Sequence, residues 1–273
     1  MTVETASPAR SSRALFVFAL FYVAFLYGPV VLLPIFSFNN SVFVAFPLSG
    51  FTTRWYSEMA ADRAMHAALW NTLTVGAIAS LGSTILGLLA AKALTQRPMR
   101  GRSAVLAATN LPLFIPEIVL GIALLLLVTT VGVPLSLASV TIGHLLICLP
   151  FALAVLMARF EGFDSSLEEA SRDLGETAWM TFWRVTFPLV LPGVVASLLL
   201  TFIVSFDDFM IAFFLSGTDV TLPVYIWGEL RFPARLPRVL ALGAAILVVS
   251  ALLIVLAEWL RRAGTEQPAR AEA

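Results

Sequence analysis

Residues 122–128 are Ile-Ala-Leu-Leu-Leu-Leu-Val, inside a longer apolar run over residues 105–131. A strand of a membrane β-barrel would alternate polar and apolar side chains over about 10 residues, and this stretch does not alternate. Backbone in lipid must satisfy its own hydrogen bonds, which leaves helices and closed barrels as spanning structures. The stretch therefore predicts a transmembrane helix.

Five further segments have the same character. Crossing the hydrocarbon core takes about 20 mostly apolar residues, and six segments are long enough: 14–36, 67–94, 105–131, 137–158, 189–214 and 239–260. Hydrophobic residues make up 59% of the 273 and charged residues 12%, whereas soluble domains are about 45–50% apolar and about 25% charged. These figures exclude a soluble globule, a disordered chain, collagen and a coiled coil. We predict an all-α polytopic membrane protein with six transmembrane helices.

The charged residues set the expected orientation. If the N-terminus is cytoplasmic, twelve of the seventeen basic residues lie inside, as the positive-inside rule requires. Six spans then place both termini in the cytoplasm. We expect a tail over residues 1–13, a transmembrane domain over 14–262 and a tail over 263–273. The 17 acidic residues balance the basic ones, which argues against a nucleic-acid partner.

The loop over residues 159–188 is the one long segment predicted on the cytoplasmic side. It carries nine charges in 30 residues, so it must face water. Ser165 and Glu168 match a capping box at a helix start, and Gly175 suits a left-handed helix end. An aromatic segment over 177–185 follows. Such an apolar surface on a polar loop indicates a docking partner, or else a helix resting on lipid headgroups.

Seven positions in this loop keep a fixed spacing: Glu169, Ala170, Ser171, Gly175, Val185, Phe187 and Pro188. They resemble the E-A-A-x3-G-x9-I-x-L-P signature of ABC importer permeases, with Ser for the second Ala, Val for Ile and Phe for Leu. The resemblance implies that the loop docks into a groove on a separate ATPase subunit. It implies that Glu169 and Gly175 form the core of the coupling helix, and that closure of the ATPase dimer moves the spans behind it.

Shorter motifs elsewhere resemble the spermidine/putrescine branch of that family. They are Phe51-Thr52, Trp55-Tyr56, Asn71-Thr72-Leu73, Pro116-Glu117-Ile118-Val119, Ser205-Phe206-Asp207-Asp208 and Thr221-Leu222-Pro223. The resemblance implies the type I importer permease fold in a bacterial inner membrane, and a polyamine substrate. It also implies a second permease subunit, two ATPase copies that hold ATP and magnesium, and a periplasmic solute-binding protein. Related branches carry opines or amino acid derivatives, ferric iron or thiamine, and these substrates stay open.

Glu117 falls inside the predicted third span, and Asp207 and Asp208 fall inside the predicted fifth span. A charge near the bilayer centre costs at least about 2.5–3.5 kcal/mol on insertion scales, so it normally faces a partner or a cavity. We expect these acids to attract a polycationic substrate along its pathway. The alternatives are a cap at a break in the fifth helix or an ion pair with the partner subunit. Adjacent helical residues point about 100° apart, so at most one of Asp207 and Asp208 faces the pathway squarely.

Other polar and small residues carry weaker signals. Tyr225, Trp227 and Glu229 follow the fifth span and are expected at the outer mouth, in an aromatic belt or in contact with the cation. His144 and Cys148 lie one helical turn apart, and a cross-helix hydrogen bond or packing is favoured over a metal pair, so no metal site is predicted. Three glycines predict a helix-packing face on the second span: Gly76, Gly82 and Gly87. Pro112 and Pro116 predict a local break in the third.

Two other classes of membrane protein carry sequence features of their own. A membrane-embedded enzyme would need a motif such as H-E-x-x-H or G-x-S-x-G, and the sequence contains neither. It has no G-x-x-x-x-G-K-[ST] loop, so this chain is not expected to bind ATP or another cofactor. A secondary transporter would need paired internal repeats with interrupted helices, and six spans with a docking loop do not suggest that architecture. The sequence therefore predicts a non-catalytic subunit of an ATP-driven importer.

Overall fold

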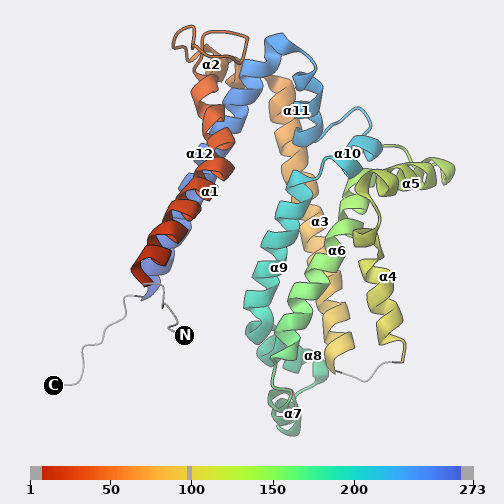
Figure 1. Ribbon diagram of the computed structural model, residues 1–273. Coiled ribbons are helices and arrows are strands. Elements are labelled where there is room, and N and C mark those ends of the chain that lie inside the picture. The colour runs from red at the N-terminus through yellow and green to blue at the C-terminus, as the bar shows by residue number, and fades with distance from the viewer. Residues whose placement is uncertain (1–7, 97–99, 266–273) are drawn as a thin grey trace, which may run out of the picture. The chain divides into compact units, whose positions relative to one another are not determined.

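The computed structural model describes residues 8–96 and 100–265 and is almost entirely helical there (Figure 1). In these ranges, extended backbone pairs only in an isolated bridge between Asn39 and Phe51. The chain divides into two compact units, Met1–Asp62 with Gly228–Ala273, and Arg63–Trp227. The sequence predicts a single transmembrane domain, and its bounds stay a prediction.

The described helices follow one another along the chain, and a long connection over residues 38–53 separates the first two. In order they are α1 (Pro8–Ser37), α2 (Arg54–Ala60), α3 (Arg63–Gln96), α4 (Arg102–Phe114), α5 (Glu117–Thr130), α6 (Leu137–Glu161), α7 (Ser166–Asp173), α8 (Ala178–Thr181), the π-helical η1 (Phe182–Thr186), α9 (Phe187–Asp207), α10 (Met210–Leu215), α11 (Leu222–Leu230), the 3₁₀-helical η2 (Pro233–Arg235) and α12 (Leu236–Thr265). Helix α1 begins at Pro8, so the described part of the predicted N-terminal tail is helical.

The predicted all-α membrane fold is confirmed. Among the described residues, five helical segments are long and apolar enough to cross a membrane, and the bent pair of α4 and α5 makes a sixth if it counts as one span. These six segments overlap the six apolar runs of the sequence. Their order along the chain is therefore the one that hydropathy predicts.

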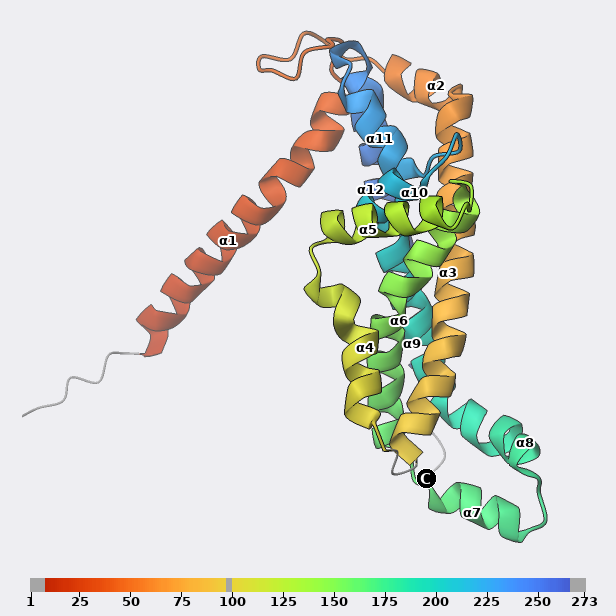
Figure 2. The same cartoon turned by 90° about the vertical axis from the view of Figure 1, so that its right-hand side faces the viewer.

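The predicted third span, over residues 105–131, is broken into two helices, as its prolines predict. Helices α4 and α5 are bent by 106° at Ile115 and Pro116, and Figure 2 shows α5 running across the direction of α4. Ile115 is extended, with φ −90° and ψ 130°, because a residue before proline is disfavoured in the helical region. Pro116 therefore produces the predicted break, whereas Pro112 lies inside α4 and does not end it.

The predicted fifth span is also interrupted. Helix α9 ends at Asp207, Asp208 is extended with φ −66° and ψ 123°, and α10 begins at Met210. The two neighbouring aspartates therefore lie at a helix end, where the backbone turns away from helical geometry.

Helices α3, α6 and α9 pack together and form the core of the Arg63–Trp227 unit. The predicted glycine face of α3 is confirmed: a Cβ at Gly87 would lie 2.9 Å from the Cβ of Ala152 in α6, and one at Gly76 would lie 3.0 Å from the ring of Phe202 in α9. Absent side chains thus let neighbouring helices approach closely. The hydroxyls of Thr84 and Ser197, 2.9 Å apart, add a buried hydrogen bond between α3 and α9.

In the other unit, α1 packs along α12. Most apolar side chains of α1 between Leu15 and Leu32 are exposed, which fits a helix surrounded by lipid tails or by other apolar helices. Beside it, Trp55 of α2 is buried and its indole N–H donates to the carbonyl of Asn39 at 2.8 Å.

Candidate functional site

The loop between α6 and α9 has the predicted order of helix, glycine turn and aromatic segment. Gly175 has φ +91°, a left-handed conformation that glycine adopts without steric cost. The backbone N–H of Gly175 donates to the carbonyl of Arg172 at 2.9 Å, and that of Glu176 donates to the carbonyl of Ser171 at 3.2 Å. These are the two bonds of a Schellman motif. The predicted left-handed end of α7 is confirmed.

The predicted capping box at the start of α7 is wrong. Ser165 makes no side-chain cap. Instead, Oδ1 of Asp164 accepts a hydrogen bond from the backbone N–H of Ser166 at 3.0 Å. Hydrogen bonds from Ser166 hold the pKa of the Asp164 carboxyl below its ordinary value. Asp164, one residue earlier, accepts the hydrogen bond at the helix start in place of Ser165, because a carboxylate is a better acceptor than a hydroxyl.

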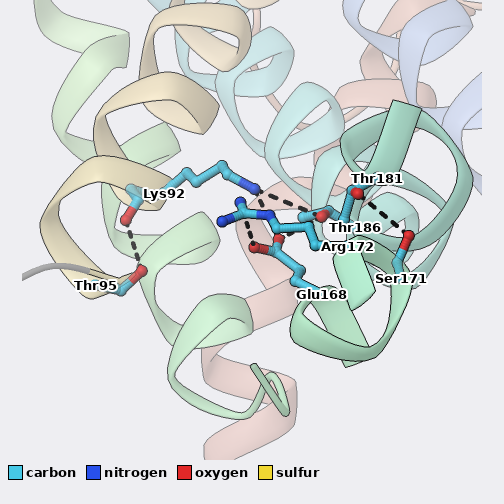
Figure 3. A network of polar contacts seen from close by, with 8 residues as sticks. Lys92, Thr95, Glu168, Ser171, Arg172, Thr181 and Thr186 are labelled. Atoms are coloured by element: carbon cyan, nitrogen blue, oxygen red, sulfur yellow. Dashed lines mark hydrogen bonds and ion pairs between the residues drawn. The ribbon is translucent and has the colours of Figure 1, made fainter. Parts of the chain in front are cut away.

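Glu168 points inward and binds three basic or hydroxyl groups (Figure 3). Its side chain is 8% exposed. Its Oε1 lies 2.7 Å from Nζ of Lys92 in α3 and accepts a hydrogen bond from the hydroxyl of Thr186 at the end of η1. Its Oε2 lies 3.9 Å from the guanidinium of Arg172. Glu168 thus joins α7 to two other elements.

The residues that match the family signature lie mostly on the outside of the loop. Glu169, Ala170, Gly175 and Pro188 are exposed, and Ser171 and Val185 are half-buried. The hydroxyl of Ser171 lies 3.1 Å from that of Thr181, which ties α7 to α8. Glu169 is therefore placed to meet another molecule, while the serine holds the loop together.

Apolar side chains are exposed on the same loop. Leu174 is 88% exposed and Trp179 is 67% exposed. Leu167 and Trp183 are also exposed. Large apolar groups on a polar loop are the usual mark of an interaction surface.

The two aspartates at the end of α9 differ in their surroundings. Asp208 is 8% exposed, and its Oδ2 accepts a hydrogen bond from the backbone N–H of Ala212 in α10 at 3.1 Å. The same oxygen lies 3.1 Å from Nε2 of His144 in α6, whose Nδ1 is 2.7 Å from the hydroxyl of Ser205. Asp207 is exposed. Asp208 therefore has the geometry of a cap at the break in the fifth helix, which is one of the two alternatives to a pathway role. Asp207 is the carboxylate that stays accessible.

Helix α6 is bonded to α9 a second time, through Cys148. Its thiol lies 3.3 Å from the carbonyl of Thr201. The favoured expectation for His144 and Cys148, cross-helix hydrogen bonding, is confirmed. In the span broken at Pro116, Glu117 is exposed in the first turn of α5.

The residues predicted at the outer mouth separate into two groups. Trp227 is exposed, with its ring centroid 5.5 Å from that of Phe209, and Tyr225 is half-buried. Glu229 is buried, and its carboxylate oxygens lie 2.7 Å from Arg235 and 3.1 Å from Arg238. Its negative charge is therefore neutralised within the chain.

The sequence did not predict the structural roles of three residues. Lys92 and Glu168 pair between α3 and α7, and Asp164 accepts a hydrogen bond from the backbone N–H of Ser166. None of the three belongs to the family signature. One signal was available: Lys92 is the only lysine among 17 basic residues.

The chain matches the family described as "Binding-protein-dependent transport system inner membrane component" over residues 83–263. It is 36% identical over 231 residues to the "Putrescine transport system permease protein PotI" of Escherichia coli strain K12, covering 82% of each chain. It is 32% identical over 244 residues to the "Spermidine/putrescine transport system permease protein PotC" of the same strain, covering 89% of this chain and 92% of the relative.

A solved structure has the same fold. It is titled "Crystal structure of a bacterial ABC transporter involved in the import of the acidic polysaccharide alginate", and one of its chains superposes with a TM-score of 0.75 at 16% identity, over 95% of this chain and 99% of that one. The chain therefore belongs to the binding-protein-dependent transport system inner membrane component family, and is a multi-pass inner-membrane permease subunit with the type I ABC importer fold.

Proposed function

We propose that this chain forms half of a pathway that carries polyamines, such as putrescine and spermidine, into the cell. The observation that carries the proposal is the likeness to two permeases named for these substrates, each over more than four fifths of the chain. Polyamines carry several ammonium groups, and a cation in a low-dielectric passage needs opposed charge along its way.

Asp207 and Glu117 are the acids that supply this charge. Both are exposed, whereas Asp208 and Glu229 are buried and each has a basic partner within the chain. Trp227 adds an aromatic face that attracts an ammonium. Tyr225 lies two residues before it on α11. The buried pair of Asp208 and His144 sets the end of α9, where Asp207 projects.

Energy for transport comes from a separate ATPase, which docks on the loop between α6 and α9. Glu169, Gly175 and the exposed side chains of Leu174 and Trp179 form the docking surface. This chain holds no nucleotide and catalyses no reaction, and ATP with magnesium binds to two ATPase copies. A second permease subunit completes the pathway, and a periplasmic binding protein delivers the substrate, in keeping with the family's description.

Both termini lie in the cytoplasm, on the side of the ATPase. Twelve of the seventeen basic residues then fall inside, and the docking loop faces the nucleotide. Cysteine labelling at Thr218, which lies outside in this topology, tests the orientation. Labelling of the tails from outside intact cells would contradict it.

Uptake by the reconstituted importer tests the function. Proteoliposomes are prepared with this chain, its partner permease and the ATPase, and the binding protein is added outside. They should accumulate radiolabelled putrescine only when ATP is enclosed in the lumen, on the side of the ATPase. Unlabelled spermidine should compete, and thiamine or ferric iron should not. Accumulation of one of those solutes with no putrescine uptake would replace the polyamine assignment while keeping the importer.

A further inference from the structure

The loop makes an ion pair with α3, between Glu168 and Lys92, that the family signature does not contain. Resting on the proposed docking of the ATPase, we propose that Lys92 is a positioning residue that couples the loop to α3. Its ion pair with Glu168 fastens α7 to the cytoplasmic end of α3, so that a movement of the loop also moves α3. Without it, the loop would act on the membrane helices through its chain connections to α6 and α9 alone.

The geometry places one carboxylate oxygen at a junction of three elements. Oε1 of Glu168 in α7 is 2.7 Å from Nζ of Lys92 in α3 and accepts from the hydroxyl of Thr186 in η1. Nζ of Lys92 is in turn 3.5 Å from that hydroxyl (Figure 3). Because η1 runs directly into α9 at Phe187, the junction joins the loop to the ends of two membrane helices.

Those two helices are already packed on each other. The hydroxyls of Thr84 in α3 and Ser197 in α9 are hydrogen-bonded, and Gly76 of α3 lies against Phe202 of α9. A displacement of the junction would therefore be passed to α3 and α9 together. Coupling between distant sites travels through such contiguous packed and hydrogen-bonded elements.

Burial makes the contact persistent. Glu168 is 8% exposed at its side chain and Lys92 27%, and removing one partner of a buried pair leaves an uncompensated charge. Lysine also suits a joint that moves, because its ammonium is a compact charge with rotatable donors on a flexible stem. The ring of Phe182, 5.2 Å from Nζ, supports the same charge from η1.

The neighbouring glutamate cannot take this role. Glu169 is exposed, because adjacent residues on a helix point about 100° apart. One glutamate thus faces the transmembrane helices while the next faces the proposed ATPase. The two functions are separable by substitution.

The experiment uses the full importer in proteoliposomes with its binding protein. Lys92→Met and Glu168→Gln remove the pair, and Lys92→Glu with Glu168→Lys reverses it. Arg172→Gln is the matched control, since it removes the other positive charge near Glu168, at 3.9 Å, without touching α3. Three quantities are measured for each variant: copurified ATPase, binding-protein-stimulated ATP hydrolysis, and putrescine taken up per ATP hydrolysed.

We expect Lys92→Met and Glu168→Gln to copurify with the ATPase and to lose about tenfold in uptake per ATP. The reversed pair should recover much of that ratio, and Arg172→Gln should match the wild type. A merely structural pair would lower hydrolysis and uptake together and leave their ratio unchanged, which would overturn the inference. So would a wild-type ratio in Lys92→Met, or an equal loss in Arg172→Gln.

If Lys92→Met does not assemble, the double variant Lys92→Glu with Glu168→Lys tests the inference in its place. Assembly with a restored ratio supports the inference, and failure of the reversed pair to assemble overturns it. A wild-type complex that binds no ATPase would contradict the proposed function and this inference with it, whereas a normal wild type beside a normal Lys92→Met contradicts the inference alone.

Discussion

Two pairs of neighbouring carboxylates, Glu168 with Glu169 in the loop and Asp207 with Asp208 at the end of α9, are arranged alike. In each pair one member is buried against a base from another helix, a lysine of α3 in the first case and a histidine of α6 in the second. The other member of each pair is exposed. The difference between them is position: the first pair begins a loop helix and the second ends a membrane helix.

This arrangement follows from backbone geometry. Glu168 and Glu169 diverge because consecutive helical side chains point about 100° apart. Asp207 and Asp208 diverge because the backbone leaves the helix at Asp208. In neither pair does one surface receive both carboxylates. The buried acid fixes a helix end in place, and the exposed acid is left for another molecule. We therefore expect substitutions of buried members to change stability and coupling, and substitutions of exposed members to change docking or transport.

The largest expected effect is on stability, at Asp208. Asp208→Ala removes the carboxylate that accepts a hydrogen bond from the backbone N–H of Ala212 in α10. It also removes the carboxylate next to the buried Nε2 of His144. Removing one partner of such a buried contact costs roughly 3 kcal/mol. The thermal unfolding midpoint of the purified protein in detergent should fall accordingly. Asp207→Ala is the matched control and should leave the midpoint unchanged; equal losses in both variants would remove the distinction between the two aspartates.

The next effect tests whether α10 is held rigidly against α6. A Cβ at Gly143 would lie 2.5 Å from Cγ2 of Ile211 and 2.8 Å from Cδ1 of Leu215, and both side chains are fully buried. Gly143→Ala should therefore destabilise the protein by about 1–3 kcal/mol. In the same unfolding assay Gly28→Ala, where a Cβ meets nothing within 4 Å, should have little effect. A tolerated alanine at Gly143 would mean that α10 shifts freely and that Asp208 does not fix it.

A smaller effect is expected at the end of α7. Gly175→Val forces a β-branched residue into a left-handed conformation, at about 1–2 kcal/mol, and should turn the docking surface away from the ATPase. Copurified ATPase should fall while insertion into the membrane persists. Gly162→Val, at φ −90°, is the control in the same loop. Equal copurification of both variants with the ATPase would contradict the assignment of the docking helix.

Hydropathy was sufficient for the order and helical character of the apolar segments, because the bilayer fixes both the length and the composition of a crossing helix. It did not give the 106° bend between α4 and α5. Proline at position 116 predicts that the helix breaks, but the angle depends on what α5 packs against. The Gly175 turn was predictable because one residue type satisfies its backbone geometry.

The partners of buried polar groups were not predictable from the sequence. The spacing of Ser165 and Glu168 fits a capping box, yet Glu168 pairs with Lys92, which lies 76 residues earlier in the chain. Likewise His144 and Asp208 meet only because α6 and α9 pack together. Local spacing indicates which partners a polar side chain could bind within its own helix, and tertiary contacts determine which partner it binds.

The most direct test of the account is putrescine uptake by the importer that carries Asp207→Asn, normalised to the amount of assembled complex. Asparagine keeps nearly the same volume and removes the charge. We expect wild-type assembly and a wild-type unfolding midpoint, with uptake reduced about tenfold because a cation loses one opposed charge on its way. Unchanged uptake would contradict a pathway role for Asp207, and loss of assembly would make the exposed aspartate a structural residue like its neighbour.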